Sequence, residues 1–331
     1  MSDVLRAGLV GLGAMGRNHA RVLQSLPDVE LVAVVDPRDP PQHPTMRVET
    51  LTTTRELLEL GIDLCIVATP TRTHEEIGLE LAAARVPTLI EKPLAHTAKA
   101  AQAIWEAFDR SGVIGCVGHI ERYNPALQDM RRRLALGELG NLYQVITRRQ
   151  GPFPDRITDA GVILDLATHD IDLTAWVTGS TYQCVSARIA HRSGRVHEDL
   201  VSTVGELSGG IVVTHLVNWL SPLKERVTTV TGEFGCFMAD TLTADLTFYK
   251  NGTQVSQWDQ MAAFRGVTEG DITRYAISKP EPLLTELSNF VAAVRGEFAS
   301  LVTMGEGLAT VRVADAVRES AITGQTIEIA P

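Results

Sequence analysis

A glycine-rich turn near the start of the chain constrains the fold more than any other feature. Gly11, Gly13 and Gly16 follow an apolar run, and helix-forming residues come directly after them. This order predicts a strand, a tight turn and a helix start, in which Gly11 permits the turn, Gly13 lets the backbone approach a pyrophosphate and Gly16 lets helix and strand pack. Because a helix N-terminus attracts negative charge, the turn, with Ala14 and Met15 in its second half, indicates a dinucleotide site.

An acidic residue supports the dinucleotide interpretation. A second apolar segment, residues 30–35, ends in Asp36, about twenty residues after the glycines. A carboxylate there can accept hydrogen bonds from both ribose hydroxyls and repels a 2′-phosphate, so it favours NAD over NADP. Arg38 leaves NADP possible. The alternative is a glycine-rich turn in another kind of α/β protein, and the strand, helix and acid taken together weigh against it.

The order of expected elements divides the chain in two. Apolar strands alternate with amphipathic helices in the first part, whereas strand-like runs dominate the second part and two helices close it. Since 331 residues exceed what one core usually covers, we expect two domains. Residues 1–120 should form an N-terminal Rossmann domain with a doubly wound parallel sheet. Residues 121–331 should form a C-terminal α+β domain with a large, mostly antiparallel open sheet.

Turn residues refine this expectation. Four prolines within residues 37–44 exclude a helix, so we expect a loop where the adenine end of the cofactor would rest. Residues 208–210 and 250–252 are typical of hairpin turns in the second sheet. The helices after residue 178 are too few to cover an open sheet, so a homodimer or homotetramer formed through that sheet is expected.

Bulk properties exclude several classes of partner. The net charge is −10, with no long basic run, which argues against nucleic acid or an anionic membrane as the main partner. No apolar window approaches a membrane span and no signal segment begins the chain, so we expect a cytoplasmic protein. The four cysteines are far apart among apolar neighbours, which favours buried free thiols, and we expect no metal.

Candidate reactive residues follow the strands of the first domain. Ligands of doubly wound sheets bind at the carboxyl ends of the strands, where this chain has residues 69–70, residues 91–93 and the segment 118–124. Lys92 in the second of these groups could donate to a reacting oxygen and stabilise a developing alkoxide. The alternative for Lys92 is an ordinary solvated cation.

A second cluster lies in an apolar helical stretch of the second domain. Asp165, His169 and Asp172 are separated by steps of four and three, which would place them on one helix face. An imidazole there can take the proton of an alcohol, and the Asp165 carboxylate can orient the ring. The alternative is a surface helix with an ordinary ion pair, and spacing alone does not decide between them.

Four motifs in this order resemble the Gfo/Idh/MocA family, the glucose-fructose oxidoreductase and inositol dehydrogenase type. They are the glycine turn, residues 91–95, residues 118–125 and the Asp165-x-x-x-His169 pair. The resemblance implies a nicotinamide cofactor and hydride transfer to or from a carbinol carbon of a sugar or polyol. It makes Lys92 the lysine near the reacting hydroxyl, often followed by a cis proline, and His169 the acid or base with Asp165 as its partner. It also places four residues along the nicotinamide half of the site: Thr69, Pro70, His74 and Glu91.

A finer resemblance concerns the substrate. Residues 118–125 together with 149–157 look like the branch that contains UDP-N-acetylglucosamine 3-dehydrogenases. Arg149 and Arg156 flank a proline-stiffened loop, and arginine forks suit a diphosphate; alternatively, they pair with local acids. The candidate substrate residues are His119, Arg122, Tyr123, Asn124, Arg149 and Arg156.

The sequence therefore indicates a dehydrogenase that transfers hydride between NAD and a secondary alcohol of a sugar, a nucleotide sugar or a polyol. Within the same class, the alternative is an NADP-dependent keto-sugar reductase. From another class, the alternative is a non-catalytic NAD(H)-binding sensor or scaffold, which would have no need of the base His169.

Overall fold

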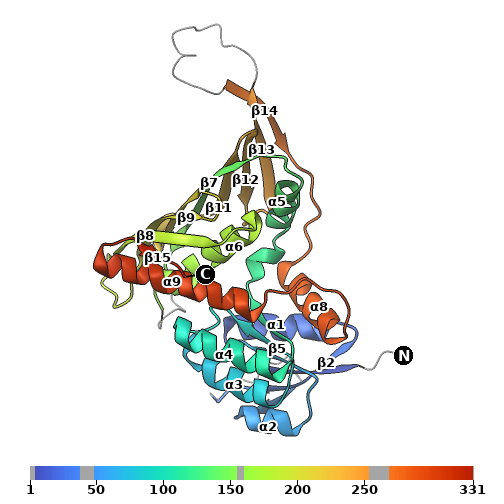
Figure 1. Ribbon diagram of the computed structural model, residues 1–331. Helices are drawn as coiled ribbons and strands as arrows, with labels where there is room; N and C mark the ends of the chain where they lie inside the picture. Colours follow the sequence, from blue (N-terminus) through green and yellow to red (C-terminus); the bar gives the residue numbers. More distant parts are fainter. Residues whose placement is uncertain (1–3, 38–47, 155–159, 253–267, 331) are drawn as a thin grey trace. The chain divides into compact units, whose positions relative to one another are not determined.

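The structure is a computed structural model that describes residues 4–37, 48–154, 160–252 and 268–330 (Figure 1). The chain forms two compact units. The first comprises Met1–Ile120 and Glu281–Asp315, and the second comprises Glu121–Pro280 and Ala316–Pro331. Residues 281–315, which the sequence placed in the second domain, thus belong to the first unit.

The first unit is built on a parallel sheet whose order is β3-β2-β1-β4-β5-β6. All five neighbouring pairs are parallel, which confirms the doubly wound sheet. The order reverses between β1 and β4, so the carboxyl ends of these two strands flank the place where such folds bind ligands. The strands are β1 (Leu5–Val10), β2 (Val29–Val35), β3 (Glu49–Leu51), β4 (Leu64–Val67), β5 (Thr88–Glu91) and β6 (Gly115–Gly118).

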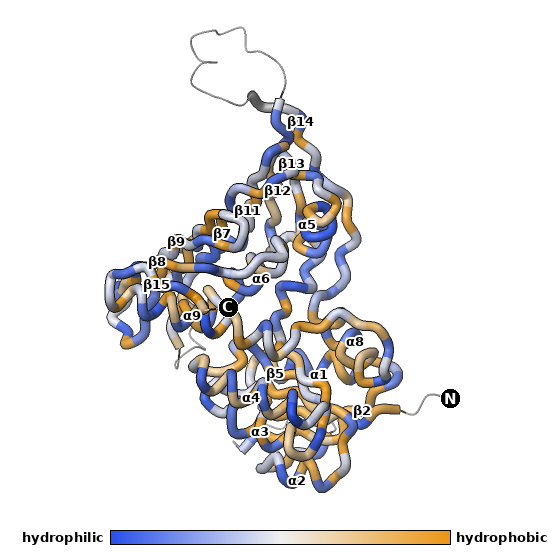
Figure 2. The backbone as a smooth tube through the Cα atoms, viewed as in Figure 1, coloured by the Kyte–Doolittle hydropathy of each residue, from blue (hydrophilic) through white to orange (hydrophobic). Residues whose placement is uncertain are grey.

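Helices cover both faces of this sheet, whose strands are apolar along most of their length (Figure 2). On one face α1 (Ala14–Ser25) and α8 (Pro282–Val294) pack through Leu23 and Phe290 against strand residues such as Leu9. On the other face Phe108 and Val311 belong to a second core. That face is covered by α2 (Thr54–Glu59), α3 (His74–Ala83), α4 (Ala98–Ser111) and the first part of α9 (Met304–Thr323), with the short helix η1 (Thr71–Thr73) before α3. Residues 281–315 therefore complete both cores.

The second unit contains a sheet of order β14-β13-β12-β11-β7-β10-β9-β8-β15. Within this sheet as described, β7 and β10 are parallel and every other neighbouring pair is antiparallel, which confirms the expected mostly antiparallel sheet. The strands are β7 (Leu142–Pro152), β8 (Tyr182–Ala190), β9 (Leu200–Leu207), β10 (Ile211–Asn218), β11 (Leu220–Gly232), β12 (Gly235–Asp240), β13 (Asp245–Gly252), β14 (Thr268–Arg274) and β15 (Ile327–Glu328).

One predicted turn is confirmed and the other is wrong. Residues 208–210 join β9 to β10, whose ends pair at Leu207 and Ile211. Residues 250–252, in contrast, continue β13, and Asn251 pairs with Glu269 of β14. Cross-strand pairing thus overrides the local turn preference of Asn-Gly. Most of the predicted loop at residues 37–44 lies outside the described residues.

Side chains alternate across the second sheet, so its two faces differ. On β9, Val201 and Thr203 are buried whereas Val204 is 51% exposed, and on β10 Val212 is 43% exposed. Among the described residues of this unit, the helices are η2 (Ile120–Tyr123), α5 (Pro125–Ala135), a single π-helical turn η3 (Ile163–Ala167) and α6 (Thr168–Thr178), with the end of α9. α5 contacts β12 and β13, and α6 contacts β7. The face that carries Val204 and Val212 keeps apolar side chains exposed.

In the described part of the chain, no helix is both long enough and apolar enough to cross a membrane.

Candidate active site

The glycine turn of the first unit contains two glycines that the fold requires and one that faces open space. Gly11 has a φ of +97°, and a Cβ on it would lie 2.6 Å from the carbonyl oxygen of Ala68, while a Cβ on Gly16 would overlap the carbonyl oxygen of Gly11. A Cβ on Gly13 would meet no protein atom within 4 Å. The fold therefore requires Gly11 and Gly16, whereas Gly13 at the start of α1 leaves space that a pyrophosphate can occupy against the helix N-terminus.

Asp36 is anchored to this turn. Its carboxylate is buried directly after β2, and its Oδ2 accepts a hydrogen bond of 2.9 Å from the backbone N–H of Leu12. The bond fixes the acid beside the turn, as a ribose-binding residue requires. Ala14 and Met15 form the first turn of α1. Arg38 lies outside the described residues.

Lys92 follows a buried carboxylate at the carboxyl end of β5. Glu91 Oε1 lies 2.7 Å from Nε2 of the buried His19, and Oε2 accepts the backbone N–H of Lys92 at 3.1 Å. Burial alone would raise the pKa of Glu91, but the bond from His19 and the charges of His19 and Lys92 outweigh it and lower the pKa. The side chain of Lys92 is half-buried. The Lys92–Pro93 peptide bond is cis, as the resemblance implied.

His74 braces two strand ends. Its Nδ1 lies 3.0 Å from the carbonyl oxygen of Pro93, and its Nε2 lies 3.0 Å from that of Thr69. Burial lowers the pKa of His74, so the ring is neutral at pH 7 and donates to one of the two carbonyls at a time. The loop after β4 is further held because the hydroxyl of Thr73 bonds both Thr69 and the carbonyl of Pro70. His74 thus fixes the two loops that present Thr69 and Lys92.

A carboxyl group that the sequence did not single out lies beneath this cluster. Glu286 of α8 is buried, and neither of its oxygens has a hydrogen-bond partner within the described residues. Burial and the charge of Glu91 raise the pKa of Glu286 well above its ordinary value, so the site favours the neutral form of this acid. An acidic residue in an otherwise apolar helix was the signal available in the sequence.

His119 also belongs to the first unit, where it is buried just after β6.

Among the side chains that the structure describes, no group of three or more His, Cys, Asp and Glu residues is arranged to hold a metal ion.

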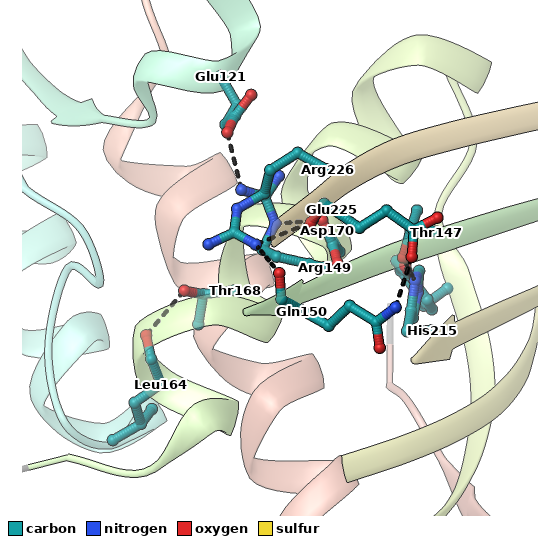
Figure 3. A network of polar contacts seen from close by, with 11 residues as sticks. Glu121, Thr147, Arg149, Gln150, Leu164, Thr168, Asp170, His215, Glu225 and Arg226 are labelled. Atoms are coloured by element: carbon teal, nitrogen blue, oxygen red, sulfur yellow. Dashed lines mark hydrogen bonds and ion pairs between the residues drawn. The ribbon is translucent and has the colours of Figure 1, made fainter. Parts of the chain in front are cut away.

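In the second unit, Asp165 and His169 stand on either side of an irregular helix junction. Asp165 lies in the π-helical turn η3 and His169 in the first turn of α6, and both side chains are half-buried. The hydroxyl of Thr168 bonds the carbonyl of Leu164 at 2.8 Å across the junction (Figure 3). Single π turns occur often at functional sites, and this one replaces the regular α-helix that the sequence predicted.

Glu198 holds the start of this turn. Its Oε1 accepts the backbone N–H of Ile163 at 3.0 Å, and its carbonyl accepts that of Val162 at 3.0 Å. A Cβ on Gly161 would overlap the Glu198 carboxylate. The missing side chain of Gly161 therefore admits Glu198, a residue that sequence reasoning missed because it lies in a charged loop distant from the motifs.

Arg149 is paired with acids, which is the alternative that the sequence left open. Its Nε donates to Asp170 Oδ1 at 2.7 Å and its Nη1 to Glu121 Oε1 at 2.8 Å (Figure 3). Burial alone would lower its pKa, but the two carboxylates outweigh burial and raise it. Arg156 lies outside the described residues.

The other expected substrate residues also have protein partners. Arg122 donates from Nε and Nη2 to the two oxygens of Asp172, at 2.8 and 2.7 Å, so Asp172 holds a buried arginine. Asn124 caps α5 through the N–H of Ala126 and bonds the carbonyl of Thr241. Tyr123 is buried.

Two further polar residues were missed. His215 of β10 lies 2.7 Å from Thr147 Oγ1 and 2.8 Å from the Tyr182 hydroxyl, and burial lowers its pKa from 6.5 to about 4. Arg226 of β11 is the register partner of Arg149. Each of the two residues lies two positions from an inward-facing residue of its strand, and this alternation was the available signal. In the sequence, however, both sit in segments that read as ordinary strand.

Comparison with known proteins agrees with this architecture. Residues 5–119 match the model of an oxidoreductase family with an NAD-binding Rossmann fold, and residues 127–238 match the GFO/IDH/MocA C-terminal domain. A scyllo-inositol 2-dehydrogenase (NAD(+)) of Bacillus subtilis is 32% identical over 196 residues, 56% of this chain and 57% of that protein. A UDP-N-acetylglucosamine 3-dehydrogenase of Acidithiobacillus ferrooxidans is 31% identical over 179 residues, 53% of this chain and 55% of that protein. The aligned regions thus span just over half of either relative.

A solved structure extends the likeness to the whole chain. The WlbA dehydrogenase from Bordetella pertussis, in complex with NADH and UDP-GlcNAcA, superposes with a TM-score of 0.84 over 100% of this chain and 99% of that chain. The two sequences are 21% identical, so this likeness establishes the fold.

Proposed function

Because the chain belongs to the Gfo/Idh/MocA oxidoreductase family, we propose that it is an NAD-dependent dehydrogenase that oxidises a secondary alcohol of a sugar, a nucleotide sugar or a polyol. The observation that carries the proposal is the glycine turn, where the open position at Gly13 and the anchored Asp36 carboxylate suit a pyrophosphate and a ribose. The names of the relatives, which act on inositol and on UDP-N-acetylglucosamine, support the substrate class.

Three side chains would perform the chemistry. His169 takes the hydroxyl proton at a ring nitrogen, and the Asp165 carboxylate orients the ring and stabilises its charged form. Lys92 donates a hydrogen bond to the reacting oxygen and stabilises its negative charge. The nicotinamide, when bound, supplies the hydride acceptor. The loops braced by His74 and the carboxylate of Glu91 hold Lys92 in place.

The first experiment measures reduced-nicotinamide absorbance with NAD and with NADP while UDP-N-acetylglucosamine, free sugars and inositols are offered. Reduction with NAD supports the proposal, whereas reduction with NADP alone would favour the keto-sugar reductase. Lys92→Ala should lower turnover by about a hundredfold or more while NAD affinity changes little. If no substrate reduces either cofactor although NAD binds, the sensor or scaffold becomes the better account.

The proposal includes a cytoplasmic homo-oligomer. The exposed apolar face of the second sheet, with Val204 and Val212, supports association through that sheet. Sedimentation at several protein concentrations tests it, and a monomer at all of them would remove this part of the proposal.

A further inference from the structure

Two guanidinium groups lie together on the covered face of the second sheet. Arg226 of β11 pairs in register with Arg149 of β7, and Thr228 and Val230, which follow it at alternate positions, are buried. Figure 3 shows the Arg226 side chain beside that of Arg149, close to Glu121 and Asp170. The two arginines therefore share one environment and can be compared directly.

Their partners differ in kind. Arg149 is held by two carboxylates. Arg226 donates from Nη1 to the backbone carbonyls of Gln150 and Glu225, each at 2.8 Å. Among the residues that the structure describes, no carboxylate lies within ion-pair distance of Arg226, and its Nε and Nη2 make no hydrogen bond. Carbonyl oxygens orient a guanidinium without neutralising it, so Arg226 keeps its charge and part of its donor fork.

In these surroundings, the positive charge of Arg226 is unfavourable unless an anion is bound to it. Arg226 is half-buried, and burial together with the charge of Arg149 lowers its pKa. The charges of Asp170, Glu121 and Asp165 act in the opposite direction from beyond contact distance. The interaction with Asp165 also shows that Arg226 lies near the turn that carries the proposed catalytic pair. A bound anion would supply the contact that these distant acids do not.

We propose that Arg226, and not Arg149, binds an anionic group of the substrate, either a phosphate of a nucleotide sugar or a carboxylate of a uronic acid. This proposal rests on the proposed function, because it places the anionic group of the substrate near Asp165 in the second unit. Phosphates and carboxylates both offer two acceptor oxygens that can take the parallel N–H donors of an arginine fork. The proposed substrate class is thereby narrowed from sugars, nucleotide sugars and polyols to its anionic members, the nucleotide sugars and uronic acids.

The test uses the full chain saturated with NADH, which occupies the glycine turn, and isothermal titration calorimetry with two probes, UDP and D-glucuronate. Arg226→Gln removes the charge but keeps donors for the two carbonyls, and Arg226→Lys keeps the charge but loses the fork. The matched control is Arg148→Gln, because Arg148 lies on the opposite face of β7, 48% exposed and paired with Glu225.

We expect Arg226→Gln to weaken binding of the anionic probe by about tenfold to a hundredfold, as for one lost charge-assisted contact. Arg226→Lys should lose less, and Arg148→Gln should bind as the wild type does. Binding of UDP alone assigns a phosphate to the site, and binding of glucuronate alone assigns a carboxylate. If wild type binds neither probe, or Arg226→Gln binds as tightly as wild type, the proposal is overturned.

Kinetics separate this proposal from the proposed function. With UDP-N-acetylglucosamine and myo-inositol as substrates, Arg226→Gln should raise KM for the nucleotide sugar only. An equal rise for both substrates would refute an anion site. A wild-type protein that binds an anionic probe through Arg226 but reduces no cofactor would refute the dehydrogenase while leaving the anion site intact.

Discussion

Replacing Arg149 with Met tests whether this residue stabilises the fold or binds the substrate. The guanidinium is 5% exposed and holds Asp170, 2% exposed, and Glu121, 17% exposed. Removing one partner of a buried ion pair costs about 3 to 5 kcal/mol, because the remaining charge stays buried without compensation. Asp170 dominates this cost, since Glu121 can regain water more easily.

The assay is urea unfolding followed by tryptophan fluorescence, to which Trp176, in the same helix as Asp170, contributes. With an m value of about 2 kcal/mol/M, the loss would move the unfolding midpoint of the second unit down by roughly 1.5 to 2.5 M. Arg148→Met is the matched control, because its pair with Glu225 is half-exposed and should contribute about 0 to 1 kcal/mol. Adding Asp170→Asn to Arg149→Met should recover part of the loss, since the stranded charge disappears.

A stable Arg149→Met variant would refute this reasoning. If its free energy of unfolding stays within about 1 kcal/mol of wild type while KM for UDP-N-acetylglucosamine rises, Arg149 binds the diphosphate, as its place beside the proline-rich loop suggested.

Three further changes have definite expected outcomes. Gly13→Ala should leave thermal stability nearly unchanged, because its Cβ meets no protein atom within 4 Å, yet weaken NAD binding measured by calorimetry; unchanged affinity would remove the turn from the cofactor site. Because the pKa of His215 falls from 6.5 to about 4 on folding, the unfolded state binds the extra proton between these values, and stability is lost as pH falls through that range. The loss between pH 7 and pH 5 should be about 2 kcal/mol, and His215→Gln should show a flatter profile in urea unfolding at the two pH values. Gly161→Ala should displace the Glu198 carboxylate and lower kcat by about tenfold, the effect of one charge-assisted hydrogen bond. Glu198→Ala should lower kcat by the same factor. If the two losses multiply in the double variant, Gly161 does not act through Glu198.

The architecture was largely predictable because its signals are local. The glycine turn, the acid after the second strand and the alternation of strands and helices each depend on neighbouring residues, and the parallel sheet follows from them. The pairing of β13 with β14 could not be predicted from local signals, because it joins residues such as Tyr249 and Ile272 that lie far apart in the sequence. The same limit explains residues 250–252, whose turn composition gave way to a distant strand.

Partners of charged residues could not be predicted from the sequence. Arg149 lies 21 residues from Asp170 and 28 from Glu121, and Arg122 lies 50 from Asp172. No periodicity links such positions, so the sequence could not decide whether Arg149 binds a diphosphate or pairs with an acid. For the same reason Arg226, which lies in a segment that reads as ordinary strand, was not predicted to bind a ligand.

The return of residues 281–315 to the first unit has a consequence for synthesis on the ribosome. Phe290 and Val311 complete its two cores, so the nucleotide-binding unit cannot complete its fold until residues 281–315 have been synthesised. A fragment that stops at Ile120 would expose an apolar surface on both sides of its sheet. A nascent chain would therefore carry an incompletely folded first unit while residues 121–280 are translated, and chaperones would protect it from aggregation during this period.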